Sequence, residues 1–128
     1  MNTTTAADRP GRSALPSRAL AASGGVLASV SVALFAYAAH AAEPQVQSSL
    51  HSAALFAFGH GIALAALGPL AVRWSARLAL MGLLLGTLLF SGSLVAAHLF
   101  GAPTVFAPLG GGLMIFAWLG WAADRLGH

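Results

Sequence analysis

The sequence predicts an all-α, polytopic membrane protein with four transmembrane helices in a compact bundle. Of its 128 residues, 58% are hydrophobic and 7% are charged, whereas a soluble domain carries about 25% charged residues. Residues 78–123 contain no Asp, Glu, Lys or Arg, and one helix over this run would be about 69 Å long. Gly101-Ala102-Pro103-Thr104 interrupts the run, so each half can cross a hydrocarbon core of about 30 Å.

The N-terminal region combines a polar leader with the first apolar run. Residues 1–18 are polar and contain three arginines, which predicts a disordered cytoplasmic tail before a transmembrane domain over 19–128. Residues 19–42 are uncharged and long enough for the first helix. A secretory signal cleaved near Ala39-His40-Ala41 is the alternative, although such signals have a shorter apolar core of about 7–15 residues.

Three further helices follow, separated by turn signals. Glu43-Pro44 ends the first helix, and we expect the second over 45–72, with Gly68-Pro69 marking its far end or a kink. A basic turn at residues 73–77 leads to the third helix, over 78–100. The fourth is expected over 105–123, where Pro108 falls in the first turn and is tolerated.

The arginines predict the orientation. All six basic residues are arginines, and in the four-helix arrangement they lie in the N-terminal leader, the 73–77 turn and the C-terminal end. The positive-inside rule then places both termini in the cytoplasm, in a cell inner membrane. Trp74, Trp118 and Trp121 fall toward the same side, as in an aromatic belt. The arginines are few and dispersed, which disfavours nucleic acid as a partner.

The third predicted helix carries two stripes of residues at helical spacing. One is small and begins with Gly82-x-x-x-Gly86, a pattern that lets helix backbones approach closely in lipid. Nearly opposite lies a polar stripe. The small stripe contains Gly82, Gly86, Ser93 and Ala97, and the polar stripe contains Thr87, Ser91 and His98. We therefore expect this helix to be central, with two faces turned away from lipid.

Ionisable groups at membrane depth raise the question of chemistry. His40, Glu43, His51 and His98 lie toward the arginine-free end, whereas His60 lies about 15 Å from Leu50, near the midplane. A hydrogen bond from His60 to Ser91 or Ser93 is plausible by depth. No spacing places two histidines on one helix face, so we expect no metal, no haem and no other cofactor. Serine catalysis would need a base and oxyanion donors that no motif supplies.

Several segments resemble the family of small four-helix membrane proteins called the domain of unknown function 423 family. The matching segments are residues 36–41 (AYAAHA), 60–64 (HGIAL), 90–94 (FSGSL) and 108–111 (PLGG), with Trp118 after them. The resemblance extends over about residues 24–123 and implies a four-helix membrane fold without an established activity. At Phe56, Val95 and Ala117, apolar residues stand where the family commonly has tyrosine or glycine.

These features predict a non-enzymatic structural, assembly or interaction role through small-residue helix packing. The expected partners are the lipid bilayer and either a second copy or another membrane protein. The alternative is a small proton-linked transporter or carrier using His60 and the polar stripe. The candidate functional or packing residues are His40, His60, Gly82, Gly86, Ser91, Gly92, Ser93, His98, Pro108, Gly110, Gly111 and Trp118.

Overall fold

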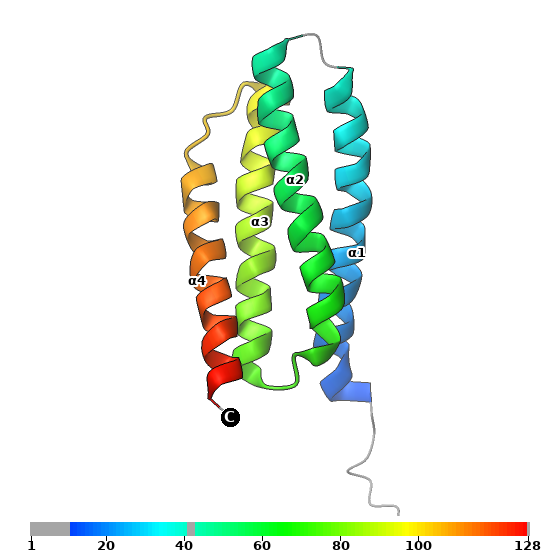
Figure 1. Ribbon diagram of the computed structural model, residues 1–128, viewed down its shortest axis with the longest axis vertical. Coiled ribbons are helices and arrows are strands. Elements are labelled where there is room, and N and C mark those ends of the chain that lie inside the picture. The colour runs from blue at the N-terminus through cyan, green and yellow to red at the C-terminus, as the bar shows by residue number, and fades with distance from the viewer. Residues whose placement is uncertain (1–10, 41–42, 128) are drawn as a thin grey trace, which may run out of the picture.

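The chain folds as four long antiparallel helices (Figure 1). The computed structural model describes residues 11–40 and 43–127, with side chains from residue 15 onward. The helices are α1 (Gly11–Ala39), α2 (Pro44–Leu67), α3 (Trp74–Phe100) and α4 (Phe106–Leu126), with a 3₁₀ turn, η1 (Gly68–Leu70), after α2. The beginning of α1, the α2–α3 connection and the end of α4 lie at one end of the bundle.

All four helices are long and apolar enough to cross a membrane, which confirms the predicted fold class. The spans contain 25, 27, 27 and 21 residues, or about 32–40 Å of helix at 1.5 Å per residue. Their outward surfaces remain apolar: Val30, Leu85 and Phe116, for example, are 58%, 53% and 73% exposed. Such a surface suits hydrocarbon, because each helix satisfies its own backbone hydrogen bonds there.

Two helix starts differ from the sequence prediction. α1 begins at Gly11 instead of residue 19, and residues 1–10 of the predicted tail lie outside the described residues. Ser17 is buried and its hydroxyl donates to the carbonyl of Ala71 at 3.1 Å, so this part of the leader packs against the α2–α3 connection. α3 begins at Trp74 instead of residue 78, which shortens the basic turn.

The other predicted breaks lie close to the observed helix ends. Pro44 is the first residue of α2, and Gly68-Pro69 ends it as a 3₁₀ turn. Gly101 closes α3 in the left-handed conformation, with φ of 65°, which only glycine adopts without strain. α4 begins at Phe106, so Pro108 lies in its first turn, where its missing N–H breaks no helical hydrogen bond.

α1 packs on α2 through glycines. A Cβ added at Gly24 would lie 2.4 Å from the Gly61 carbonyl oxygen, and one at Gly61 would lie 2.8 Å from the Gly24 oxygen. Gly68 is similarly close to Ala21, at 2.9 Å from its backbone nitrogen. These backbones touch only because no side chain intervenes. Gly61 and Gly68 thus bring α2 and the turn after it against α1.

α3 packs on α4 through a second pair of glycines. A Cβ at Gly110 would lie 2.6 Å from the Gly86 carbonyl oxygen and 2.5 Å from the Phe90 nitrogen. A Cβ at Gly82, by contrast, would meet Ala117 at an ordinary 3.6 Å. The expected Gly82-x-x-x-Gly86 motif is therefore corrected: Gly86 makes the close approach with Gly110, and Gly82 does not.

Replacing Gly110 with alanine should test this contact. We expect a loss of about 1–3 kcal/mol in the free energy of unfolding, because the new methyl group would meet backbone atoms that cannot rotate away. Gly112→Ala is the matched control, since no atom lies within 4 Å of a Cβ at Gly112. Equilibrium unfolding in detergent micelles gives both values, and equal stabilities for the two variants would contradict the packing assignment.

Candidate functional site

His60 and Trp118 form a polar contact inside the membrane-spanning region. The Trp118 indole N–H donates to His60 Nε2 at 3.1 Å, while His60 Nδ1 lies 2.7 Å from the carbonyl oxygen of Phe56, one turn earlier in α2. A carbonyl only accepts and an indole N–H only donates, so Nδ1 carries the proton and Nε2 the lone pair. Both ring nitrogens of a neutral His60 are thereby occupied.

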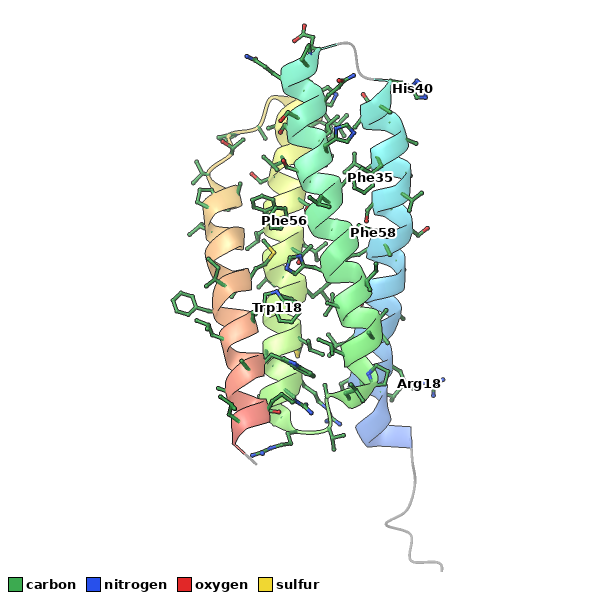
Figure 2. The ribbon with its side chains drawn as sticks, in the orientation of Figure 1. Arg18, Phe35, His40, Phe56, Phe58 and Trp118 are labelled. Atoms are coloured by element: carbon green, nitrogen blue, oxygen red, sulfur yellow. The ribbon has the colours of Figure 1, made fainter. Side chains whose placement is uncertain are left out.

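Aromatic rings surround this contact. The His60 ring stacks on Phe56 with centroids 5.9 Å apart and planes 8° apart, and Phe56 contacts Phe90 at 4.6 Å between centroids. Trp118 comes from α4 and Phe56 from α2 (Figure 2). The cluster therefore joins α2, α3 and α4 around one neutral imidazole.

This arrangement corrects two predictions. The expected hydrogen bond from His60 to Ser91 or Ser93 is wrong, because the His60 nitrogens bond Phe56 and Trp118 instead. Trp118 was also expected in an aromatic belt, but it lies near the middle of the fourth span, Phe106–Leu126, and bonds His60 there. Helical spacing gives depth along an axis, whereas these partners depend on how each helix is rotated about that axis.

The Phe90–Leu94 segment divides its polar groups between different neighbours. Ser91 is buried, and its hydroxyl donates to the Ala53 carbonyl of α2 at 2.8 Å. Ser93 is also buried, and its oxygen has no hydrogen-bond partner. A Cβ at Gly92 would meet nothing within 4 Å, so this candidate packing residue makes no close approach to another helix. Gly92 instead lines a small cavity of about 160 Å³ between α1 and α3.

The other three histidines of the described residues, His40, His51 and His98, lie toward the arginine-free end. His98 Nε2 lies 3.1 Å from the Tyr37 hydroxyl of α1, a partner that the sequence analysis missed. His51 contacts the Phe35 ring at 6.0 Å between centroids, and His40 is exposed just beyond α1. Within the described residues, no three His, Asp or Glu side chains are grouped so that they could hold a metal ion.

The other candidate residues lie on α4. Gly110 faces Gly86, whereas a Cβ at Gly111 would touch the Phe90 ring only at 4.0 Å. Pro108 is exposed in the first turn. The structure thus brings together His60 with Trp118 and Gly86 with Gly110, and it leaves His40, Gly92 and Pro108 outside both contacts.

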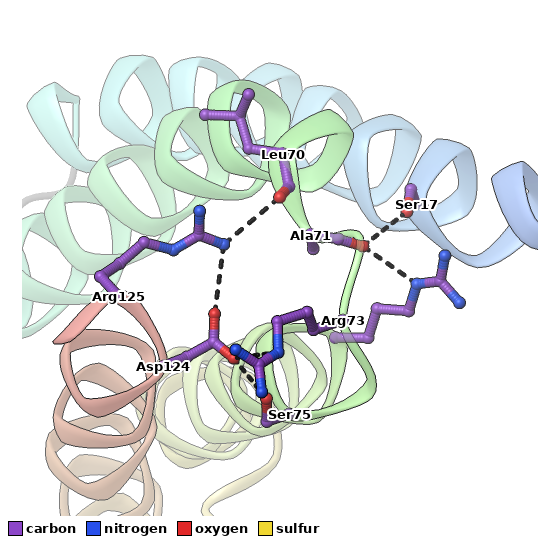
Figure 3. A network of polar contacts seen from close by, with 8 residues as sticks. Ser17, Leu70, Ala71, Arg73, Ser75, Asp124 and Arg125 are labelled. Atoms are coloured by element: carbon purple, nitrogen blue, oxygen red, sulfur yellow. Dashed lines mark hydrogen bonds and ion pairs between the residues drawn. The ribbon is translucent and has the colours of Figure 1, made fainter. Parts of the chain in front are cut away.

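A network at the arginine end was also missed (Figure 3). The Asp124 side chain is only 2% exposed. Its Oδ1 accepts a hydrogen bond from the Ser75 hydroxyl and lies 3.8 Å from Arg73 Nε. Its Oδ2 lies 3.3 Å from Arg125 Nη2. Arg125 also donates to the Leu70 carbonyl at 3.3 Å. The signal was available: Asp124 is the one acidic residue after residue 43, and a lone carboxylate beside arginines often forms ion pairs.

Ser91 and Ser93 offer a matched test of the hydrogen bond between α2 and α3. We expect Ser91→Ala to lower the free energy of unfolding by about 0.6 kcal/mol, the mean for hydrogen bonds between membrane helices. Ser93→Ala should cost nothing, because its hydroxyl has no partner to lose. Unfolding in detergent micelles measures both variants. A larger loss for Ser93→Ala than for Ser91→Ala would contradict the assignment.

Comparison with known proteins supplies the family. The model for a protein of unknown function, DUF423, matches residues 34–111, more than half of the chain. This match includes Phe90–Leu94 and Pro108–Gly111 and ends before Trp118. A search of curated proteins finds no match, and neither does a search of solved structures. The resemblance seen in the sequence is confirmed, and the chain belongs to the DUF423 family of proteins of unknown function.

Proposed function

We propose that this protein has a structural and interaction role in the membrane, with no catalytic step. The observation that carries the proposal is the use of His60: one ring nitrogen bonds the Phe56 carbonyl and the other accepts from Trp118. A polar group that is satisfied between helices stabilises their packing. Ser91 and Thr87 support the same interpretation, since the Ser91 hydroxyl donates to the Ala53 carbonyl of α2 and the Thr87 hydroxyl lies 3.5 Å from the Met114 sulfur of α4.

The competing hypothesis is a proton-linked carrier that uses His60 and the polar stripe of α3. A carrier histidine must gain and lose a proton during each cycle. Protonation of His60 at Nε2 would put two N–H donors face to face and break the Trp118 bond. The contacts of His60 therefore favour a fixed packing role over proton transfer.

A second copy or another membrane protein is the proposed partner. The close-packed glycines already contact other helices of the same chain: Gly24, Gly61, Gly86 and Gly110. A partner would therefore bind the outward apolar face. That face includes Val30 of α1 and Phe116 of α4 among other exposed side chains. Close packing inside the chain would then supply a rigid surface for this interaction.

Flux measurements separate the two hypotheses. We expect purified protein in liposomes with an internal pH dye to show no proton flux above empty liposomes. We expect His60→Ala to lower only the thermal midpoint, because the stacking and the Trp118 bond are lost. Trp118→Phe is the companion variant, which removes the N–H donor and keeps an aromatic ring. Proton flux that disappears in a folded His60→Ala variant would refute the structural role.

We further propose that the protein lies in the cell inner membrane with both termini in the cytoplasm. Four arginines lie at one end of the bundle, in helix ends or in the α2–α3 connection: Arg18, Arg73, Arg77 and Arg125. By the positive-inside rule, their position supports this orientation. Reporter fusions after Glu43 and at the C-terminus provide the test. We expect the C-terminal fusion to be active as a cytoplasmic reporter and the Glu43 fusion as an external one. The reverse pattern would overturn the orientation.

A further inference from the structure

An apolar groove of about 550 Å³ runs along the first half of α3, with α4 on one side. Gly82 leaves space in its wall, because a Cβ there would meet no atom closer than 3.6 Å. Leucine and methionine side chains form most of the remaining lining. Those of Leu78, Met81, Leu85 and Leu88 of α3 are each about half exposed, and Leu84 of α3 and Leu113 of α4 are partly buried.

The length of the groove favours a lipid chain over a helix as its occupant. From Leu78 to Leu88 is ten residues, or about 15 Å along the helix axis. This distance is half of a hydrocarbon core of about 30 Å and therefore equals the depth of one leaflet. A phospholipid acyl chain extends over one leaflet, whereas a transmembrane helix of a partner would cross both.

Two side chains stand at the end of this groove nearest the connection between α2 and α3. Trp74 is 71% exposed and precedes Leu78, Met81 and Leu85 by 4, 7 and 11 residues. Arg77 precedes Met81 and Leu88 by 4 and 11 residues. Residues at these spacings lie along one face of a helix, so Trp74 and Arg77 belong to the face of α3 that lines the groove, one turn before its first residues.

The charge at this end suits an anion. Four described arginines lie there with Asp124 as their one described carboxylate, because Glu43 is at the other end of the bundle. Arg77 is held in place by its own Nε, which donates to the Ala71 carbonyl at 3.0 Å. α3 has no acidic residue in its first turn and no side-chain cap, so the positive end of its dipole adds to the attraction.

We propose that this groove binds an anionic phospholipid. The acyl chain lies along Leu78–Leu88, and the phosphate group lies beside Arg77, with the Trp74 ring at the level of the glycerol backbone. The positive charge selects the headgroup and the groove holds the chain. The proposal does not depend on the structural role proposed above, because a lipid-binding groove is compatible with a carrier as well as with a structural protein.

Native mass spectrometry can test the headgroup contact. The full chain is reconstituted in nanodiscs of equal phosphatidylglycerol and phosphatidylcholine, and the ratio of the two lipids retained on the released protein is measured. Arg77→Gln should lower this ratio about fivefold, the effect of removing one basic residue near an anionic surface. Arg77→Lys should keep most of the preference. Arg18→Gln is the matched control, because Arg18 is exposed at the same end but on α1, and should leave the ratio unchanged.

A second pair of variants tests the groove. Leu85→Trp should fill it and reduce the number of retained phosphatidylglycerol molecules, whereas Leu109→Trp on the exposed face of α4 should not. Thermal midpoints in detergent establish whether each variant is folded. If Arg77→Gln is unfolded, the comparison of Leu85→Trp with Leu109→Trp tests the proposal by itself. Three results would overturn the proposal: an equal effect of Arg18→Gln, full lipid retention in Leu85→Trp, or a dimer that Leu85→Trp abolishes.

Discussion

Apolar helices gain no hydrophobic energy by leaving lipid for one another, so close packing must supply the attraction between them. In this chain the attraction depends on backbone contact at two glycine pairs, Gly24 with Gly61 and Gly86 with Gly110. Dispersion falls steeply with separation, and one methyl group at these points would move the helices apart. The bundle is thus two tightly packed helix pairs, α1–α2 and α3–α4, joined along α2 and α3.

The hydrogen bonding of polar groups in the membrane spans is also governed by lipid as the surrounding solvent. Lipid offers no hydrogen bonds, so a buried donor or acceptor is stabilised only by a partner within the protein. His60 does so with Trp118 and Phe56, and Ser91 does so with Ala53. The Trp118–His60 and Ser91–Ala53 bonds cross between the two helix pairs, from α4 to α2 and from α3 to α2. They set the relative position of the pairs where glycine contacts are absent.

The two ends of the bundle differ in chemistry. At the arginine end, Asp124 draws Ser75, Arg73 and Arg125 together, and Ala71 accepts bonds from Ser17 and Arg77. These polar contacts join α1, the α2–α3 connection, α3 and α4 at that end. At the opposite end, Tyr37 with His98 forms a smaller contact between the helix pairs, and Phe35 with His51 forms one within the α1–α2 pair. The charged end is therefore the more extensively cross-linked one.

The sequence by itself determined the four spans, most of their ends and the family, because length, charge gaps, glycine and proline are read along one dimension. It also drew attention to His60, Gly86, Gly110 and Trp118. Only the tertiary structure decided that Trp118 bonds His60, that Gly82 and Gly92 lie outside the close contacts, and that Ser17 packs against Ala71. In a soluble helix the polar face marks the outside. Here lipid and protein interior are equally apolar, so the rotation of each helix is set by packing against its neighbours.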